Sequence, residues 1–450
     1  MLFTTDWLEE FLTPMTGRNN QYEIYEVMTD SRKNANNALF IPLIGGNFDA
    51  HTYLEQAVEN GAVATIWDKG KPLPEKLDPS IAVYMVEDTL MTLQQIASKY
   101  RDQVNPKVIG ITGSNGKTTT KDMVASIMKT TFMTHHTQGN FNNHIGLPLT
   151  ILSMKRETEV LVLEMGMSHA GEIDTLTRIA RPDYALITNI GESHIEYLGS
   201  REGIAKAKLE IENGLKTDGI LLLDGDEPLL SFKHQHVNVV TCGFEPGNEH
   251  VITSVHISHN KTDFDVDGQS YTIPLPGKHH AKNAALAMSV CGKLGVTQEC
   301  IQKGLLDLEI TSMRFQLLEG KQDVAIINDA YNASATSMKA AIEVVKQMEG
   351  FKKKVLVLGD ILELGDYAEE LHRSVADAIE PPVDTVYTFG ESANWISSEL
   401  QNKGTDIEIE HFTTKSALIE ALQPYLNKET LILFKASRGL KFETMVEAIS

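Results

Sequence analysis

The sequence predicts an α/β protein of three domains, and three observations lead to this prediction. The chain has 450 residues, of which 42% are hydrophobic, and domains usually hold about 100–200 residues. Short apolar runs alternate with helical periodicity, which is typical of a mostly parallel sheet. A glycine-rich turn at 113–116 follows one of these runs and opens a helical stretch. We expect domains at 1–104, 105–312 and 313–450.

The first domain, residues 1–104, carries β-rich runs followed by one helical pattern. After this helix the polar segment RDQVNP (101–106) is interpreted as a linker, because Pro106 disfavours helix in the residue before it. The expected elements are strands at Leu39–Leu43, Ala62–Trp67 and Ile81–Val86, and a helix at Thr89–Arg101.

The second domain, residues 105–312, alternates strands with helices and therefore predicts a mostly parallel sheet. Between Val237 and Pro274 the pattern changes to short strands with polar turns, which predicts an antiparallel flap. The other expected elements are strands at Val108–Thr112, Val160–Glu164, Tyr184–Ile190 and Ile220–Leu223, and helices at Lys117–Met128 and Ala281–Leu294.

The third domain, residues 313–450, alternates strand and helix again, so we expect a second open, Rossmann-like α/β sheet. In such sheets ligands lie beyond the carboxyl ends of the strands, which makes polar residues just after each apolar run the candidates. The expected strands are Ala325–Asn328, Lys354–Leu358, Thr385–Phe389, Ile407–His411 and Thr430–Phe434.

Charge and cysteine content exclude several classes of protein. The chain carries 40 Lys and Arg against 61 Asp and Glu, a formal charge of −21, which disfavours nucleic acid or an anionic membrane as the main partner. The 3 cysteines form no CxxC pair and fit a reducing compartment. The acidic start resembles no secretory signal, and no apolar run is long enough to span a membrane. We therefore expect a cytoplasmic protein.

The strongest local signal is the run VIGITGSNGKTTT, an apolar strand that enters a glycine-rich turn and then a helix. Backbone amides of such a turn and the positive helix end hold phosphate groups. Lys117 would neutralise the β- and γ-phosphates, and the Thr118 hydroxyl can bind Mg²⁺. Ile111 stands where a strict Walker A motif has its first glycine, so a chance glycine turn is the alternative. The turn residues are Gly113, Ser114, Asn115, Gly116, Lys117, Thr118 and Thr119.

The run GSNGKT resembles the GTNGKT form of the Mur ligase superfamily, the ATP-dependent peptide ligases of cell-wall synthesis and folate polyglutamylation. Further motifs follow in the order found in the branch that adds D-alanyl-D-alanine to UDP-MurNAc-tripeptide, and they cover essentially the whole chain. They are TDSRKNANNALFIPLIGGNFDAH, GNFNNHIGLPLT, LEMGMSHAGEI, ITNIGESHIEYLGS, IAKAKLEI, GKHHAKNAALA, MRFQ, INDAYNASATSMKAA, LGDILELG and FKASRG.

Two residues after apolar strands are candidate metal ligands. Glu164 ends an expected buried strand, where a lone carboxylate is costly unless it is paired or bound to metal; an exposed strand-end glutamate is the alternative. His194 follows the next strand, and an isolated histidine of this kind is usually structural. The resemblance implies that Glu164 and His194 bind magnesium beside Thr118, with two Mg²⁺ ions in the site.

Lys208 lies on an apolar face of an expected helix. At 100° per residue Ile204, Lys208, Ile211 and Leu215 form one stripe, and Lys206 points to the opposite face. A lysine in such a stripe either extends its charge to solvent or is placed for function. The resemblance implies that Lys208 is carbamylated and that its new carboxylate helps to hold the second magnesium ion.

The resemblance also implies residues for the nucleotide and the two other substrates. Arg314 has an independent rationale, since a guanidinium from a second domain can offset the charge that builds on the γ-phosphoryl oxygens. The family usually has YNANP after its aspartate, whereas this chain has YNASA. The implied nucleotide residues are Asn283, Arg314 and Asp329; those for the UDP-sugar and its peptide are Ser31, Arg32, Gly45, Gly46, Asn47, Asn140, Asn142 and Asn143; those for the dipeptide are Lys435, Ser437 and Arg438.

The resemblance implies a uridine-nucleotide module, a P-loop ATPase core and a C-terminal ligase domain. The expected reaction joins D-alanyl-D-alanine to UDP-MurNAc-tripeptide through an acyl phosphate, with small-molecule substrates and a monomeric protein. Lys117, His194, Lys208 and Arg314 are the expected catalytic residues. Three alternatives remain open: a sister ligase that adds lysine or diaminopimelate, a folate polyglutamyl ligase, and a catalytically silent nucleotide-binding regulator.

Overall fold

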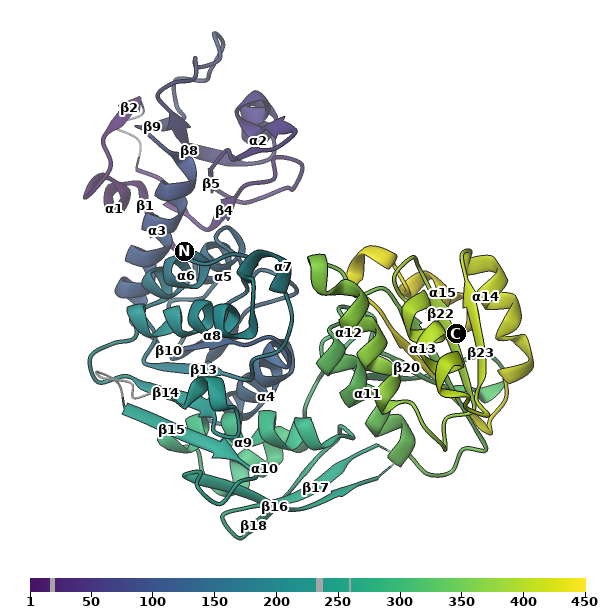
Figure 1. The fold of residues 1–450 in the computed structure, drawn as a ribbon. Coiled ribbons are helices and arrows are strands. Elements are labelled where there is room, and N and C mark those ends of the chain that lie inside the picture. The colour runs from purple at the N-terminus through teal and green to yellow at the C-terminus, as the bar shows by residue number, and fades with distance from the viewer. Residues whose placement is uncertain (17–20, 232–237, 259) are drawn as a thin grey trace.

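The structure is a computed structural model that describes residues 1–16, 21–231, 238–258 and 260–450. In these residues the strands form sheets of five, nine and six strands, in chain order, and two short two-stranded ribbons. Figure 1 shows the five-stranded sheet above the nine-stranded one, with the six-stranded sheet and its helices to one side. The predicted α/β fold class is confirmed.

The N-terminal sheet has the order β2-β9-β8-β5-β4 and is parallel except for β2. Its core contains Phe40 and Trp67, both fully buried. The strands are β1 (Phe3–Thr4), β2 (Pro14–Thr16), β3 (Glu23–Ile24), β4 (Glu26–Met28), β5 (Ala38–Phe40), β6 (Ile44–Gly45), β7 (Phe48–Asp49), β8 (Ala62–Asp68) and β9 (Ala82–Val86), and the helices are α1 (Thr5–Glu9), α2 (Leu54–Glu59) and α3 (Thr89–Val104).

Helix α3 joins this sheet to the central domain and is longer than predicted. The Asp88 side chain accepts from Met91 N and caps its start. The helix continues to Val104 and ends at Asn105, which has a left-handed backbone, so the linker interpretation of 101–106 was wrong for its first four residues. Proline stops a helix only at the residue before it, and Pro106 therefore permits helix up to Val104.

The central sheet has the order β11-β12-β10-β13-β14-β15-β16-β17-β18. Strand β10 lies between β12 and β13, parallel to both, with Ile111 opposite Glu164 and Thr112 opposite Ile187. Its strands are β10 (Lys107–Thr112), β11 (Thr134–His136), β12 (Val160–Glu164), β13 (Tyr184–Ile187), β14 (Ile220–Asp224), β15 (Asn238–Gly243), β16 (His250–Ile257), β17 (Thr262–Val266) and β18 (Gln269–Ile273).

The helices of this domain pack against the sheet and bury its apolar residues in two clusters. Helices α4 and α9 pack against each other, and Figure 1 shows both beside the sheet. The helices are α4 (Lys117–Lys129), α5 (Gly146–Leu152), α6 (Glu172–Ala180), α7 (Ile195–Leu198), α8 (Arg201–Leu209), α9 (Lys278–Lys293) and α10 (Gln298–Leu306).

The segment predicted as an antiparallel flap extends the central sheet instead. Strand β15 pairs in parallel with β14, and β16 pairs in parallel with β15. The predicted antiparallel pairing is confirmed only for β17, which is antiparallel to both β16 and β18. The polar turns suggest a separate unit, but β15 is apolar enough to add to the sheet edge. Val237 and His259, which belong to the predicted segment, lie outside the described residues.

The C-terminal sheet has the order β19-β20-β24-β21-β22-β23, and all but the edge strand β19 are parallel. The sequence did not predict β19, which is short and half exposed. The strands are β19 (Gln316–Glu319), β20 (Ala325–Asn328), β21 (Lys353–Gly359), β22 (Thr385–Phe389), β23 (Glu408–Phe412) and β24 (Thr430–Lys435), and the helices are α11 (Ala335–Gln347), α12 (Ala368–Val375), α13 (Asn394–Lys403), α14 (Lys415–Ala421) and α15 (Glu443–Ile449).

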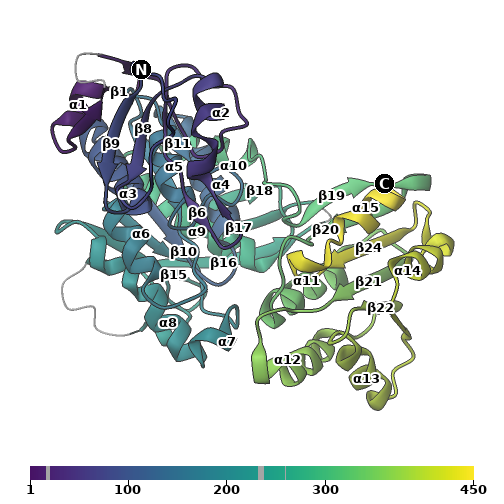
Figure 2. The ribbon, with the colours of Figure 1, turned by 90° about the horizontal axis from the view of Figure 1, so that it is seen from above.

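Helix α4 holds the segment that leads into the C-terminal domain. The Asp122 carboxylate accepts from Thr311 N at 3.0 Å and from Thr311 Oγ1 at 2.9 Å. The same carboxylate pairs with buried Lys121 at 2.5 Å. Figures 1 and 2 both show helices α11 and α12 on the side of the C-terminal domain that faces the central domain.

No helix among the described residues combines the length and the apolar character needed to cross a membrane.

We expect Asp122→Asn to lower the free energy of unfolding by about 3–5 kcal/mol, because it leaves the buried Lys121 charge without a carboxylate and with only the neutral Thr137 carbonyl as acceptor. The measurement is the unfolding transition of the full chain by calorimetry. The double variant Lys121→Met/Asp122→Asn keeps an acceptor for Thr311 and removes the unpaired charge, so it should recover most of the loss. A double variant as unstable as Asp122→Asn would contradict this explanation.

Candidate active site

The glycine turn after β10 has the geometry of a phosphate-binding loop. Gly116 has a φ of +79° and is the N-cap of α4, with no side chain to cap the first turn. A Cβ on Gly116 would lie 2.8 Å from Asn283 Oδ1, so only glycine allows this close approach. The first N–H groups of α4 and its positive end therefore face the position where an anion can bind.

Polar residues after β13 hold the turn in place. Asn189 accepts from Ser114 N at 3.0 Å through its carbonyl and from Asn115 N at 2.9 Å through its side chain. The Thr188 hydroxyl donates to Asn115 O at 2.6 Å. Sequence reasoning did not single out Thr188 or Asn189, because it placed both inside the expected strand Tyr184–Ile190. Strand β13 ends at Ile187, and with that boundary the strand-end rule would have found them.

Lys117 at the start of α4 folds back onto the turn. Its Nζ donates to Gly113 O at 2.7 Å and to Ser114 O at 3.2 Å. Burial lowers the pKa of Lys117 to about 8, Glu164 acts against this shift, and Arg314 adds to it. Keeping the Lys117 amine charged at this position therefore costs free energy, because the two carbonyl groups that accept from it carry no negative charge.

Glu164 ends β12 next to this turn and is 2% exposed. Its Oε1 accepts from Asn142 Nδ2 at 2.8 Å. Its Oε2 is buried and has no hydrogen-bond partner within the described residues. A buried carboxylate oxygen without a partner is costly, and a cation would satisfy it, which excludes the exposed-glutamate alternative.

His194 lies at the start of α7 and has a left-handed backbone, with a φ of +65°. Its Nδ1 forms an ion pair with the Glu363 carboxylate of the C-terminal domain. Burial lowers the pKa of His194, and Glu363 acts in the opposite direction. The histidine therefore has one ring nitrogen engaged by a carboxylate from another domain.

Lys208 is 2% exposed on α8, whereas Lys206 is exposed. The predicted difference between the two lysines is confirmed, although the α-helix ends at Leu209 and a 3₁₀ turn carries Ile211. Burial lowers the pKa of Lys208 well below its ordinary value, and the charge of Lys117 lowers it further. A neutral amine at this position is a nucleophile rather than an ion.

The C-terminal domain brings Arg314 to the turn. Arg314 Nη2 donates to Thr118 Oγ1 at 3.3 Å, and its guanidinium lies over the Tyr331 ring at 4.1 Å. Ser334 and Ala335 stand where the family usually has Asn-Pro, and Ser334 caps α11 and donates to Asn115 Oδ1 at 3.2 Å. The departure from the family pattern therefore leaves an ordered helix start that contacts the turn.

Two residues predicted for different substrates are paired in the structure. Lys435 Nζ lies 2.5 Å from Asp329 Oδ2, and Asp329 Oδ1 accepts from Phe315 N at 3.1 Å. Lys435 is buried beside this carboxylate. Of the other dipeptide candidates, Ser437 Oγ accepts from Leu362 N at 3.0 Å, and the half-exposed Arg438 pairs with Glu443 at 3.2 Å.

The remaining candidates lie in two groups. In the N-terminal domain Ser31 Oγ donates to Gln56 Oε1 at 2.7 Å, and the exposed Arg32 pairs with Asp30 at 2.8 Å; Gly45, Gly46 and Asn47 form the β6–β7 turn. In the central domain Asn142 is engaged by Glu164, Asn143 Oδ1 accepts from Gly146 N at the start of α5, and Asn140 is exposed. The structure therefore does not gather every predicted residue around the turn.

The residues near the turn fit a magnesium site in part. Within the described residues no group of three or more His, Cys, Asp and Glu side chains is placed to hold a metal ion. The predicted set contains two such side chains, Glu164 and His194, and the unpartnered Glu164 oxygen suits a hard cation. A carboxylate on Lys208 would supply a third ligand and the second acidic one.

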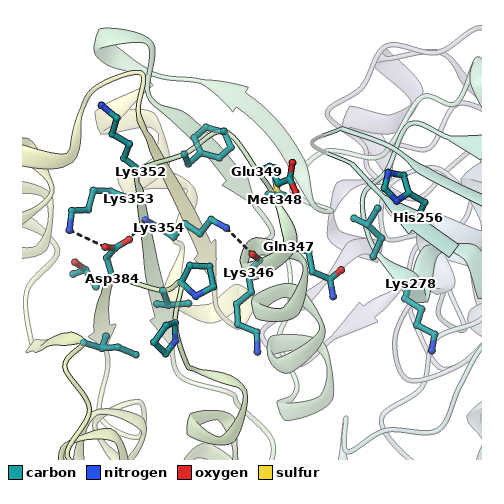
Figure 3. A pocket seen from close by; sticks show the side chains of 18 of the residues that line it. His256, Lys278, Lys346, Gln347, Met348, Glu349, Lys352, Lys353, Lys354 and Asp384 are labelled. Carbon is teal, nitrogen blue, oxygen red and sulfur yellow. Dashed lines mark hydrogen bonds and ion pairs between the residues drawn. The ribbon is translucent and has the colours of Figure 1, made fainter.

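A large groove lies elsewhere in the described residues. It is a groove of about 1630 Å³ between the β16 region and the residues that follow α11. Figure 3 shows Lys278 and His256 on one side of the groove and Lys346, Lys353 and Asp384 on the other. Two of its lysines have acidic partners, since Lys353 pairs with Asp384 at 2.9 Å and Lys346 with Glu380 at 2.7 Å. The glycine turn, where Lys117 and Arg314 have no ion-pair partner among the described residues, is therefore the better candidate for binding an anion.

Comparisons with known proteins agree with this geometry. The Mur ligase middle domain profile matches residues 111–291, and the profile of the Mur ligase, glutamate ligase domain matches 313–438. The chain is 48% identical to the UDP-N-acetylmuramoyl-tripeptide--D-alanyl-D-alanine ligase of Bacillus subtilis, over 95% of this chain and 94% of the relative.

Solved structures extend the likeness to the whole fold. A MurF from Acinetobacter baumannii superposes with a TM-score of 0.85 at 31% identity, over 97% of this chain and 99% of that one. The Thermotoga maritima MurF ligase, solved in complex with ADP, gives a TM-score of 0.82 at 30% identity, over 94% and 96% of the two chains.

We expect the stability difference between the wild type and Lys117→Met to depend on pH. The folded protein lowers the pKa of Lys117 from 10.5 to about 8. Between these pH values the unfolded chain binds more protons at this residue, so the wild type gains stability relative to the variant as the pH rises. Calorimetry of both proteins without nucleotide measures the difference.

Lys206→Met is the matched control, because this lysine is exposed on α8; its difference from the wild type should stay constant. A stability difference between the wild type and Lys117→Met that does not change with pH would contradict the lowered pKa of Lys117.

Proposed function

The chain belongs to the Mur ligase family, and we propose that it joins D-alanyl-D-alanine to UDP-N-acetylmuramoyl-tripeptide, converting ATP to ADP and phosphate. The observation that carries the proposal is the meeting of the glycine turn, Lys117 and Arg314 from another domain at one strand end. The 48% identity to a ligase of this name over nearly both whole chains supports the substrate assignment.

The reaction has two steps, and the chain's residues position and stabilise charge in both. The terminal carboxylate of the tripeptide attacks the γ-phosphorus of ATP, which forms an acyl phosphate and releases ADP. The amine of D-alanyl-D-alanine then attacks the acyl carbon, loses a proton, and displaces phosphate through a tetrahedral intermediate. Lys117 and Arg314 offset the negative charge on the transferred phosphoryl group.

Asn283 and Asp329 complete the proposed nucleotide site. Asn283 packs against Gly116, which suits a contact with the base above the phosphate turn. Asp329 would contact the ribose while Lys435 holds its other oxygen. Because Lys435 is committed to this carboxylate, Arg438 and Ser437 are the better candidates for the dipeptide carboxylate. The proposed UDP site lies in residues 1–104, around Ser31, Arg32 and the turn 45–47, and Asn140 and Asn143 are the proposed contacts for the peptide.

We propose two Mg²⁺ ions held by Thr118, Glu164, His194 and carbamylated Lys208. When bound, the ions would neutralise phosphate oxygens and orient them for attack. The carbamate forms when the neutral Lys208 amine attacks the carbon of carbon dioxide and releases one proton, which converts a neutral amine into an oxygen anion. The low pKa of Lys208 supports this step, since only the neutral amine reacts.

We further propose that the chain works in the cytoplasm as a monomer. The cysteines at 242, 291 and 300 are free, which supports a reducing location. A monomer is sufficient, because every proposed ligand of ATP comes from one chain.

We expect phosphate release that requires both UDP-N-acetylmuramoyl-tripeptide and D-alanyl-D-alanine. The dipeptide should give turnover, whereas single lysine or diaminopimelate should give only the background rate, because the Bacillus subtilis relative is named for adding the dipeptide. A coupled phosphate assay with each acceptor measures this. Turnover with a single amino acid would identify a sister ligase, and no turnover with any acceptor would favour the silent regulator.

We expect Lys208→Ala to lose most turnover and still bind ATP through Lys117 and Thr118. Acetate should restore part of the rate by supplying an oxygen ligand in the vacated space. Lys206→Ala, with its exposed side chain, is the matched control and should be nearly silent. The measurements are steady-state turnover with and without acetate, and ¹³C NMR of the wild type in labelled bicarbonate.

Absence of a carbamate resonance together with full activity of Lys208→Ala would overturn the carbamate. Equal rescue of a Glu164→Ala variant by acetate would show that acetate acts on the site in general.

A further inference from the structure

One loop of the C-terminal domain reaches the candidate active site. Residues 360–367, between β21 and α12, contact the start of α7 in the central domain. Glu363 pairs with His194 Nδ1, Glu363 O accepts from Glu196 N at 3.3 Å, and the Tyr367 hydroxyl donates to Gly199 O at 2.8 Å. The contact with His194 is the one that involves a proposed metal ligand.

The loop is held in shape before it reaches the other domain. Buried His372 accepts from Ile361 N at 3.0 Å, and its Nδ1 lies 2.6 Å from Ala368 O, so it closes the loop from both ends. Ser437 Oγ accepts from Leu362 N at 3.0 Å. These bonds fix the two residues before Glu363 and the residue that begins α12.

Glu363 itself has a φ of +62°. This left-handed conformation is unusual for a residue with a long side chain, and it persists only where the surroundings impose it. Such residues gather at functional sites. In this conformation the Glu363 carboxylate reaches His194 across the domain boundary, and we take this contact as the reason for the strained backbone.

Metal-binding histidines usually donate their second ring N–H to a carboxylate, which fixes the ring orientation and the tautomer. The Glu363 carboxylate forms an ion pair with His194 Nδ1, which has no partner in hydrogen-bond geometry among the described residues. This contact leaves Nε2 as the nitrogen available to a metal ion. Glu164 shows the same arrangement, since Asn142 holds Oε1 and leaves Oε2 without a partner among the described residues. Each proposed ligand is therefore held at one atom and open at the other.

We propose that Glu363 is a positioning residue that orients His194 for Mg²⁺ from the opposite domain. The proposal rests on the proposed function, and it makes the metal site complete only when the C-terminal loop is docked on α7. Docking of the 360–367 loop and binding of Mg²⁺ thus favour each other, because the C-terminal domain carries the Glu363 carboxylate that orients His194.

The test compares metal binding in the full-length wild type, Glu363→Gly and Glu363→Gln. Glycine tolerates the left-handed backbone and removes the carboxylate; glutamine keeps an acceptor for Nδ1–H but removes the charge. Mn²⁺ is the probe, titrated by electron paramagnetic resonance in the presence of a non-hydrolysable ATP analogue. Turnover gives the Mg²⁺ concentration for half-maximal rate and the KM for D-alanyl-D-alanine.

We expect Glu363→Gly to weaken Mn²⁺ binding and to raise the half-maximal Mg²⁺ concentration by roughly 10–100-fold. The glutamine variant should show a smaller rise, and the dipeptide KM should stay within about twofold of wild type, since the positioning role touches no substrate. Mn²⁺ binding needs no turnover, so it remains informative even if the wild type fails to use the proposed substrates.

Tyr367→Phe is the matched control, because it removes another contact of the same loop with the central domain and leaves Glu363 in place. It should weaken Mn²⁺ binding far less than Glu363→Gly does, because the carboxylate that orients His194 is still present. An equal loss in Tyr367→Phe would overturn the proposal in favour of docking alone. Unchanged Mn²⁺ binding in Glu363→Gly would also overturn it, and a rise in dipeptide KM alone would reassign Glu363 to the substrate amine.

Discussion

The candidate site depends on the parallel pairing of three strands. Strand β10 lies between β12 and β13 and is parallel to both. The glycine turn, Glu164 and Thr188 therefore lie side by side at the carboxyl ends of these strands. The register places Ile111 opposite Glu164, and Gly113 passes so close to Thr188 that any Cβ there would collide with its side chain. A shift of register would separate these groups, which is why the apolar strand interiors, although they do no chemistry, determine where the chemistry can occur.

This arrangement gathers positive charge that the protein itself does not neutralise. Burial lowers the pKa of both Lys117 and Lys208. Arg314 lowers the pKa of Lys117 further, Lys117 does the same to Lys208, and Glu164 raises the pKa of Lys117. Charging these two lysines in the free protein therefore costs free energy. A polyanionic nucleotide offsets this cost of buried positive charge when it binds. The same charges that lower the stability of the free protein therefore raise its affinity for the nucleotide. The apolar clusters on both faces of the sheet provide the compensating stability.

The sequence predicted what local pattern determines, and it failed where distant segments meet. Strand ends and the buried face of Lys208 follow from periodicity, because a strand interior or a helix stripe must be apolar to be buried. The contact of Arg314 with Thr118 joins residues almost 200 positions apart, and no local pattern encodes such a pairing. Asn142 was predicted near substrate, yet its amide is engaged by Glu164, since an asparagine in a turn gives no sign of its partner. The flap prediction was right for the antiparallel pairs of β17 with β16 and β18 and wrong for β15, for a related reason: a strand that extends a sheet and a separate hairpin have the same alternation.

The contact between Arg314 and the glycine turn depends on a nearby anchor, the hydrogen bonds of Asp122 to Thr311. Helix α4 begins at Lys117, and Asp122, little more than one turn later, holds Thr311 of the connecting segment. Arg314 follows three residues after that anchor and reaches back to Thr118. Because an α-helix rises only 1.5 Å per residue, the turn and the anchor move as one rigid body. The connecting segment is short, so Arg314 cannot move far from the phosphate position even when the rest of the C-terminal domain rotates. The docking of the 360–367 loop on α7 then selects one orientation among those that this anchor permits, which explains how a few polar contacts can define the geometry of a site shared by two domains.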